Sequence, residues 1–253
     1  MMPQNSVVMA TYRQAKYLRD SIGSVLKNLE GLEGYLCLVP VCGDSETSEW
    51  MRSSLKPLEP KLKEKVFIHP SIKADLWHQR QLGLNTGLFR YVTFFDSDDV
   101  MLPGWLDRGL KVAQEITSRG NIPIVGPSYR MVDEKLRPIQ DVILPEFTMK
   151  AMMGGCIIPD FSITTTEALR SVGGFFDPDG YDPGHPYYSY AMFLRVLKKY
   201  GSKVEVKLLP EIGFLYRQHK KAMHHRFAKT KKKSQENVRT QQEIARHYFA
   251  GEA

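Results

Sequence analysis

The stretch that decides the fold reads YVTFFDSDD and covers residues 91–99. Its first half is rich in β-branched and aromatic residues, which is typical of a buried strand. It then ends in three carboxylates, Asp96, Asp98 and Asp99, whose charges repel one another unless a cation neutralises them. The residues alone leave two interpretations open: a divalent-metal site at the end of a strand, or an acidic turn that caps a helix beginning near Pro103.

Strands and helices alternate around this stretch through the first half of the chain. Hydrophobic periodicity predicts strands at 5–10, 35–41, 66–68, 91–96 and 122–125, and helices at 14–28, 49–55, 74–88 and 103–117. Such alternation predicts an α/β fold with a doubly wound, mainly parallel sheet flanked by helices. Ligands bind such sheets outside the carboxyl ends of the strands, so the turns at 11–13, 43–45 and 96–99 are the expected binding turns.

The second half of the chain is less regular. We expect loops at 152–158 and 176–186, strands at 161–165 and 203–209, helices at 166–172 and 188–200, and a helical tail from 234. The sequence therefore predicts one α/β domain over residues 1–222, followed by a basic, helical C-terminal extension over 223–253.

Composition and length restrict the class of protein. With 253 residues, of which 42% are hydrophobic, the chain can bury a substantial core. No apolar stretch approaches the roughly 20 residues that cross a bilayer, and the first residues do not resemble a secretion signal. The three cysteines show no metal-ligand spacing, which is typical of small buried residues in a reducing compartment. We therefore expect a cytoplasmic protein with no transmembrane segment.

A basic run lies near the C-terminus. The net charge is +7, and residues 217–233 contain eight lysines and arginines, three histidines and no acid. Such a segment can face a diphosphate, an anionic membrane surface or a nucleic-acid backbone, or it can be a solvated tail without a ligand.

Four segments in order carry a resemblance to a known family. They are VVMATYR at 7–13 with the helix that follows, RQLGLN at 80–85 leading to FDSDD at 95–99, TT to GGF at 164–175, and YRQH at 216–219. Together they resemble the family 2 glycosyltransferases of the GT-A fold, which move a sugar from a nucleotide sugar to an acceptor hydroxyl. The resemblance implies a nucleotide-sugar half, about 1–126, and an acceptor half, about 127–222.

The resemblance also implies a metal cofactor, Mn²⁺ or Mg²⁺, held by the acid cluster. Asp98 with help from Asp96 is the expected ligand pair, and Asp99 is an alternative direct ligand. His219 is expected as an additional ligand, unless it is a solvated member of the basic run. The cation would neutralise the diphosphate as it leaves the sugar.

Further residues are expected to contact the nucleotide-sugar donor. They are Thr11, Tyr12, Arg13, Asp44, Arg80, Asp96, Ser97 and Arg217. Asp44 is expected to accept a hydrogen bond from the base, or else to be a turn residue beside Gly43. The family usually has a pair of acids there, so this departure leaves the base open, although a UDP-sugar is favoured. Arg80 and Arg217 would offset the diphosphate charge, unless they are surface arginines.

The base that removes the acceptor proton is not evident. Inverting members commonly begin the helix after the GGF segment with Glu-Asp, whereas that position here reads Tyr188-Ser189. The candidate catalytic residues are therefore Asp179, Asp182 and His185 in the preceding loop, although a plain acidic turn also explains the two aspartates.

Residues and resemblance together predict a metal-dependent, inverting glycosyltransferase whose acceptor is a glycan or a lipid-linked saccharide. One alternative is transfer to a hydroxylated base of DNA, with residues 217–233 on the backbone. The same run could instead attach a cytoplasmic enzyme to an anionic membrane surface. An alternative of another class is a catalytically silent GT-A-like binding protein, which the missing Glu-Asp pair keeps open.

Overall fold

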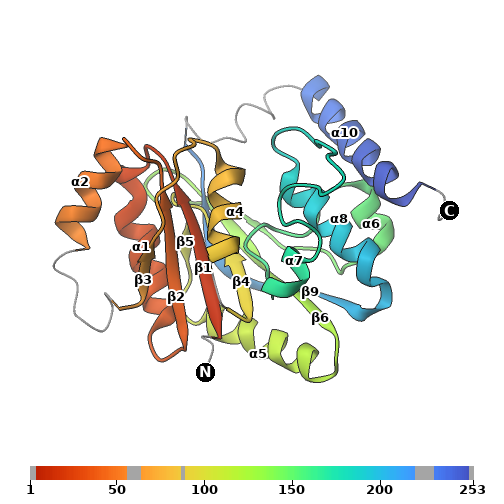
Figure 1. Cartoon of the computed structure of the whole chain (residues 1–253), viewed down its shortest axis with the longest axis horizontal. Coiled ribbons are helices and arrows are strands. Elements are labelled where there is room, and N and C mark those ends of the chain that lie inside the picture. Colours follow the sequence, from red (N-terminus) through yellow and green to blue (C-terminus); the bar gives the residue numbers. More distant parts are fainter. Residues whose placement is uncertain (1–3, 56–63, 87–88, 220–230, 251–253) are drawn as a thin grey trace.

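The computed structural model of the chain describes residues 4–55, 64–86, 89–219 and 231–250. In this part of the chain the strands form one nine-stranded sheet in the order β3-β2-β1-β4-β8-β6-β9-β5, with β7 paired to β6. Figure 1 shows helices on both faces of this sheet. None of the described helices is both long and apolar enough to cross a bilayer.

The elements have the following bounds. The strands are β1 (Asn5–Thr11), β2 (Gly34–Pro40), β3 (Val66–Ile68), β4 (Tyr91–Phe94), β5 (Val100–Met101), β6 (Ile122–Val132), β7 (Pro138–Val142), β8 (Ile163–Thr165) and β9 (Val204–Arg217). The helices are α1 (Ala15–Leu29), α2 (Ser45–Ser54), α4 (Leu76–Thr86), α5 (Trp105–Ser118), α6 (Met149–Gly154), α7 (Thr166–Arg170), α8 (Tyr188–Tyr200), η1 (Gly201–Lys203) and α10 (Lys231–Phe249).

The sheet is mixed but mostly parallel. β1 pairs in parallel with β2 and β4, β2 with β3, and β6 with β9. β8 runs antiparallel between β4 and β6, and β5 and β7 are antiparallel to β9 and β6. The predicted α/β class, with a mainly parallel sheet between helices, is therefore confirmed.

Alternation along β1 divides the core between the two faces of the sheet. Val7 and Met9 belong to a buried cluster that includes Leu18 of α1 and Trp105 of α5. Val8, between them, belongs to a second cluster that includes Phe193 of α8 together with residues of α4, α6, α7 and α10. Successive strand residues point to opposite faces, so a strand that is apolar throughout is covered by helices on both sides.

Two long strands differ from the prediction. β6 continues to Val132 and β9 to Arg217, whereas the expected strands end at 125 and 209. A proline usually indicates the end of a strand, and Pro127 and Pro210 interrupt both segments. The β6–β9 pairing absorbs this interruption by register shifts around Ser128. The extended β9 consequently reaches the loop that follows β4.

Helix α2 begins earlier than expected, and α6 is a helix that the sequence does not predict. The helix expected at 49–55 already begins at Ser45, because the Asp44 carboxylate accepts hydrogen bonds from the N–H and hydroxyl of Thr47 at 3.3 and 2.6 Å. The predicted loop at 152–158 begins inside α6, which Thr148 caps with a 3.1 Å bond from the N–H of Ala151.

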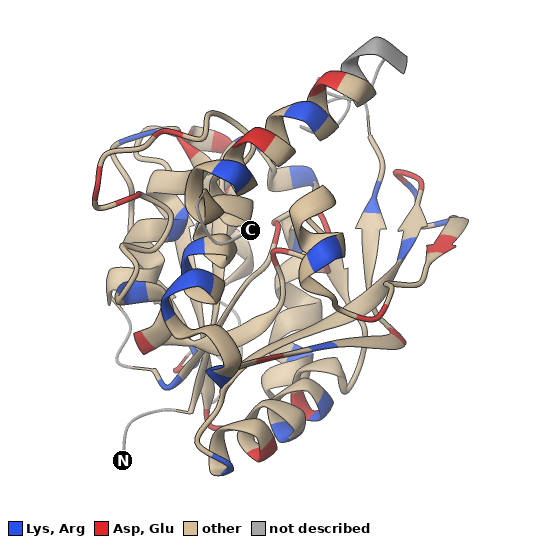
Figure 2. Cartoon of the chain, turned by 90° about the vertical axis from the view of Figure 1, so that its right-hand side faces the viewer, with Lys and Arg blue, Asp and Glu red and all other residues tan. Residues whose placement is uncertain are grey.

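Helix α10 packs on the side of the molecule that carries α6 and α8 (Figure 1). Its Ile244, Ala245 and Tyr248 are buried in the same cluster as α8, and the Tyr248 hydroxyl donates to Asp177 at 2.6 Å. Acidic and basic residues are interspersed along the helix (Figure 2). The predicted helical tail thus contributes to the core, while the division at 222 stays a prediction.

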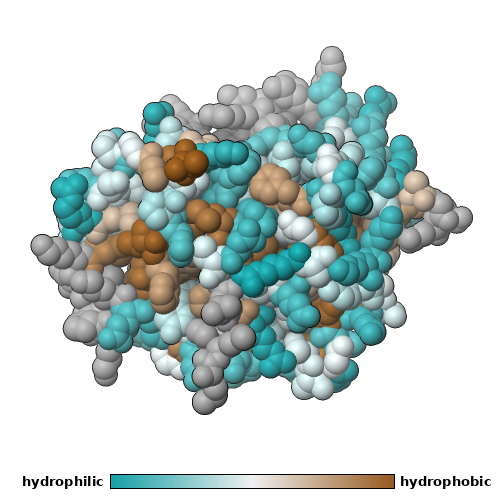
Figure 3. Space-filling model, in the orientation of Figure 1, coloured by the Kyte–Doolittle hydropathy of each residue, from teal (hydrophilic) through white to brown (hydrophobic). Residues whose placement is uncertain are grey.

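Strand β3 forms one edge of the sheet. Among the described residues no strand pairs with its outer side, and Phe67 and Ile68 are about half exposed. Figure 3 shows apolar surface over this edge within more hydrophilic surroundings. An edge of this kind is a surface on which another chain can pair.

Candidate functional site

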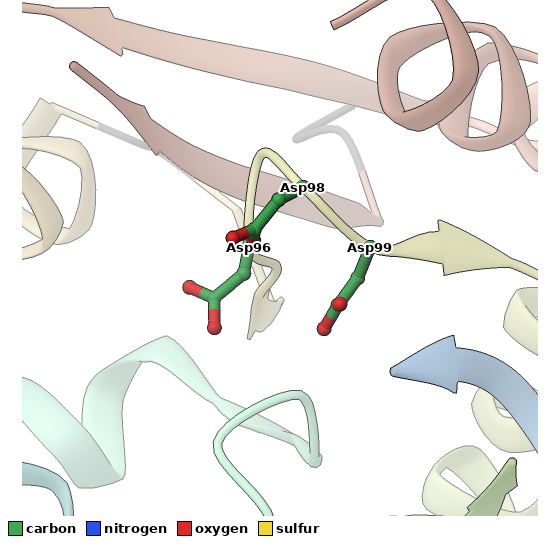
Figure 4. Close-up of side chains that lie close together, drawn as sticks. All are labelled: Asp96, Asp98 and Asp99. Carbon is green, nitrogen blue, oxygen red and sulfur yellow. The ribbon is translucent and has the colours of Figure 1, made fainter. Parts of the chain in front are cut away.

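The side chains of the three clustered aspartates project from the short loop after β4 (Figure 4). Their ligand oxygens lie within 4.8 Å of one another. Asp96 and Asp98 are half-buried, and Asp99 is 3% exposed. Because β1, β2 and β4 are parallel, this loop lies at the same sheet edge as the turns after β1 and β2. Convergent carboxylates with an open side are a suitable ligand set for Mg²⁺ or Mn²⁺.

The cluster is electrostatically unfavourable as long as only protein groups surround it. Burial, followed by repulsion from Asp98 and Asp96, raises the pKa of Asp99 well above its usual range. Burial and the nearby carboxylates likewise raise the pKa of the Tyr216 phenol. A divalent cation would lower both pKa values, so the residues present fit such a cation.

His219 lies beside the cluster. Its Nε2 is 2.8 Å from Asp98 Oδ2, and its ring centroid is 4.8 Å from that of Tyr17. The residue is 5% exposed, so it is not a solvated member of the basic run. An imidazole in this position is available as a nitrogen ligand beside the three carboxylates.

Arg217 fastens the end of β9 to the acidic loop. Its backbone N–H donates to Asp99 Oδ1 at 2.8 Å, and its side-chain Nε donates to the Asp98 carbonyl at 2.6 Å. The two terminal nitrogens donate to Asp20 Oδ2 at 3.0 Å and to the Glu134 carbonyl at 2.9 Å. The guanidinium is thus engaged with protein oxygens, and its predicted contact with a diphosphate stays a prediction.

Arg80 of α4 joins the acidic loop to the second half of the chain. It is 1% exposed, and its Nη2 donates to Asp96 Oδ1 at 2.7 Å. Its Nη1 donates to Asp160 Oδ2 at 2.5 Å and lies 3.5 Å from Ser189 Oγ. The sequence prediction missed Asp160, for which the only local signal is an acid placed directly before the strand expected at 161–165.

The turns after β1 and β2 are joined by Asp44. Its Oδ2 accepts the N–H of Arg13 at 2.7 Å, and the same carboxylate caps α2. Burial works to raise the pKa of Asp44, but these hydrogen bonds hold it below its usual value. The neighbouring Tyr12 ring is exposed, with the Arg13 guanidinium carbon 4.9 Å from its centroid. The structure therefore brings together three of the residues that are expected to contact the nucleotide sugar.

Two other residues that are expected to contact the nucleotide sugar are buried. Thr11 is buried, and its carbonyl accepts a hydrogen bond from Gln79 at 3.1 Å. Ser97 is also buried, and its carbonyl accepts the Ser21 hydroxyl at 2.6 Å. Both residues are thus held through their backbone carbonyls, and their contact with the nucleotide sugar stays a prediction.

The three catalytic candidates lie in the loop before α8. Asp182 accepts hydrogen bonds from the Tyr188 hydroxyl at 2.7 Å and from the Gly184 N–H at 2.8 Å, and both lower its pKa. Burial and this carboxylate raise the pKa of Tyr188 to about 12. The exposed Asp179 donates its N–H to Asp177 at 2.8 Å.

Trp77 places the remaining candidate, His185, near the site. The His185 and Tyr188 ring centroids are 5.6 and 5.4 Å from that of Trp77, which lies 5.2 Å from the Arg80 guanidinium carbon. His185 therefore lies one side chain away from Arg80, and Asp182 is one hydrogen bond beyond Tyr188.

The basic run is only partly visible. Arg217 and His219 lie at the acidic loop, but residues 220–230 fall outside the described residues. The predicted contact of 217–233 with DNA or an anionic membrane accordingly stays a prediction.

Comparison with known proteins gives a family and a fold. Residues 6–171, more than half of the chain, match the family model described as glycosyl transferase family 2. This region contains the acid cluster, Arg80 and Asp160. A curated relative, an uncharacterised glycosyltransferase of Methanocaldococcus jannaschii, is 27% identical over 110 residues, which are 43% of this chain and 37% of that protein.

Solved structures of S. aureus TarS are similar in fold. One matches with a TM-score of 0.59 and 16% identity, covering 85% of this chain and 60% of that chain. TarS in complex with UDP-GlcNAc matches with a TM-score of 0.64 and 14% identity, covering 98% of this chain and 73% of that chain. At such low identity the likeness concerns the fold, and it agrees with the GT-A type predicted from the sequence.

Proposed function

The chain belongs to glycosyl transferase family 2, and from this membership we infer that it moves a sugar from a nucleoside diphosphate to an acceptor hydroxyl. We propose a UDP-sugar as the donor, because TarS, whose fold is similar, is known in complex with UDP-GlcNAc. The observation that carries the proposal is the convergence of Asp96, Asp98 and Asp99 within 4.8 Å at the end of β4.

The acid cluster would hold Mn²⁺ or Mg²⁺, with His219 beside it as a further ligand. When bound, this cation supplies positive charge against the diphosphate that leaves the sugar. Arg217 and Arg80 fix the loop from which the three carboxylates project, since each donates to it from a buried position. Their contribution is to keep the carboxylates converged before any ligand arrives.

The nucleoside would lie over the turns after β1 and β2. Tyr12 offers an exposed ring for stacking on the base. Asp44 holds the backbone of Arg13, and therefore fixes the turn that presents this ring. Support for this placement comes from the parallel strands, whose carboxyl ends bring these turns and the acidic loop to one edge.

For the acceptor we propose a glycan or a lipid-linked saccharide, with inversion at the anomeric carbon. Family membership supports this choice. A hydroxylated base of DNA would be the acceptor only if the basic run binds a nucleic-acid backbone, and residues 220–230 of that run are not described.

A screen of nucleotide sugars tests the proposed function. The purified protein is incubated with each donor and Mn²⁺, released nucleoside diphosphate is measured, and thermal unfolding is followed with UDP in the presence of Mn²⁺ or EDTA. We expect slow hydrolysis of a UDP-sugar and a UDP-dependent rise in Tm, both abolished by EDTA.

Absence of hydrolysis and of stabilisation for every donor would overturn the proposal. Stabilisation by UDP and Mn²⁺ without hydrolysis or transfer would instead identify a catalytically silent binding protein.

A further inference from the structure

The proposed function leaves one chemical role unassigned, the base that accepts the proton of the incoming hydroxyl. The first turn of α8 begins with Tyr188 and Ser189, neither of which is an acid. Ser189 is nevertheless buried 3.5 Å from Arg80, at the border between the acidic loop and the acceptor half. A base close to this border therefore has to come from another part of the chain.

Asp160 supplies a carboxylate at this border. Its Oδ2 accepts from Arg80 Nη1 at 2.5 Å, while Nη2 of the same guanidinium donates to Asp96 at 2.7 Å. The two nitrogens belong to one planar group, so Asp160 stands next to the acid cluster on its acceptor side. Its side chain remains 33% exposed, which leaves it accessible to a substrate.

The loop that carries Asp160 is fixed at both ends. The Pro159 carbonyl accepts the N–H and the hydroxyl of Ser162 at 3.0 and 2.7 Å. The Phe161 carbonyl accepts the hydroxyl of Thr93 on β4 at 2.7 Å. Because β4 leads directly into the acidic loop, the position of Asp160 is tied to that of the cluster.

The geometry of the pair with Arg80 leaves Asp160 competent for proton transfer. Oδ2 is held by the guanidinium, whereas Oδ1 accepts no hydrogen bond from the described residues. Asp182 likewise keeps one oxygen without a hydrogen bond from the described residues, since Tyr188 and the Gly184 N–H both donate to its Oδ1. What distinguishes Asp160 is its bond to Arg80, the side chain that also donates to Asp96 of the acid cluster. A base must have an oxygen that can reach the proton it removes.

We propose that Asp160 is the catalytic base of this chain, positioned by Arg80 beside the acid cluster. The Asp160 carboxylate takes the proton of the acceptor hydroxyl while the oxygen of that hydroxyl forms a bond to the anomeric carbon. The bond from that carbon to the diphosphate breaks, and the leaving nucleoside diphosphate keeps the electron pair. Asp160 then returns the proton to solvent. This inference rests on the proposed function.

The test uses Asp160→Asn and water as the acceptor, with the UDP-sugar that the wild-type protein hydrolyses. Asparagine keeps an oxygen for Arg80 but cannot take a proton, so kcat for hydrolysis should fall by about 10²–10⁴-fold. The KM for the donor and the Tm rise with UDP and Mn²⁺ should stay within about twofold of wild type. Asp160→Glu should restore part of kcat.

A matched control is Asp141→Asn, which removes a carboxylate from an exposed pair with Arg130. This variant should hydrolyse the donor at the wild-type rate. Asp182→Asn and His185→Ala complete the set.

Three results would overturn the inference. The first is an Asp160→Asn enzyme with wild-type kcat, and the second is loss of activity in Asp182→Asn or His185→Ala alone. The third is joint loss of kcat and of stabilisation by UDP in Asp160→Asn, which would indicate a donor-binding role. Inactivity of the wild-type protein would overturn the proposed function itself, and this inference with it.

Discussion

Asp98 is the residue at which the acid cluster meets its histidine neighbour. We predict that Asp98→Asn weakens UDP binding in the presence of Mn²⁺ by at least about tenfold, because it removes one ligand charge and alters the contact with His219. At a UDP concentration of 100 times Kd, the wild-type protein should gain about 2.7 kcal/mol of stability, and a tenfold loss of affinity removes about 1.3 kcal/mol of that gain.

Thermal unfolding with UDP, with and without Mn²⁺, measures this difference. Asp107→Asn, which opens an exposed pair with Lys111 on α5, is the control and should bind UDP as the wild type does. Equal responses of Asp98→Asn and wild type to Mn²⁺ would contradict the assignment of the metal site.

Asp44 is a second residue whose role can be separated by substitution. Asp44→Ala should lower the free energy of unfolding by about 1 kcal/mol, because the first turn of α2 loses its cap, whereas Asp44→Asn should cap the helix nearly as well at neutral pH. Urea unfolding of both variants checks this prediction, and equal losses would count against capping.

The lowered pKa of Asp44 also predicts a pH dependence. A carboxyl whose pKa is lower in the folded state stabilises the fold above its unfolded pKa, about 3.9, and loses that contribution as the pH falls below it. The stability of wild type relative to Asp44→Asn should therefore be constant near neutral pH and decrease below about pH 4. A constant difference down to pH 3 would contradict it.

At the scale of elements, α4 is the helix that places Arg80, and it packs closely on β1. A Cβ at Gly83 would collide with Val8 Cγ1. Gly83→Ala should therefore destabilise the protein by about 1–3 kcal/mol in spite of the better helix propensity of alanine. Gly23 on α1 has nothing within 4 Å of such a Cβ, so Gly23→Ala should stabilise by about 0.5–1 kcal/mol. Urea unfolding should show a lower free energy of unfolding for Gly83→Ala and a higher one for Gly23→Ala. A stabilising Gly83→Ala would be inconsistent with this packing.

The elements that the sequence predicts well are those whose signal is local. The apolar run at 91–96 with its three acids is contiguous, so both the strand and the cluster can be found without knowledge of the fold. β6 and β9 were predicted too short because their pairing with each other, rather than local propensity, carries the chain past Pro127 and Pro210.

Contacts between distant residues explain what was missed in the site. Arg80 and Asp160 are 80 positions apart, and no sequence pattern links them. The same holds for the ring contact between Trp77 and His185, which depends on how α4 packs against the loop before α8. His219 could be placed because the closing YRQH segment resembles a family motif, not because of its own surroundings.

At the scale of the whole molecule, α10 decides whether the last residues belong to the core. Ile244 is 1% exposed between α6 and α8, so Ile244→Ala should reduce the free energy of unfolding by about 2–5 kcal/mol. Val238→Ala, at an exposed position of the same helix, should change it by less than about 0.5 kcal/mol. A single cooperative transition with unequal midpoints is expected. Equal stability of both variants would mean that α10 is an independent extension.

The attachment of β9 to the acidic loop has a consequence for how the protein is made. The N–H of Arg217 and the ring of His219 follow their aspartate partners by 118 and 121 positions. At the usual synthesis rates of about 5–20 residues per second, the ribosome needs about 6–24 s to make the intervening chain. For that time the nascent chain carries three neighbouring negative charges without the backbone donor and the imidazole that later face them. The centre is therefore completed only after strands β1 to β8 have been synthesised.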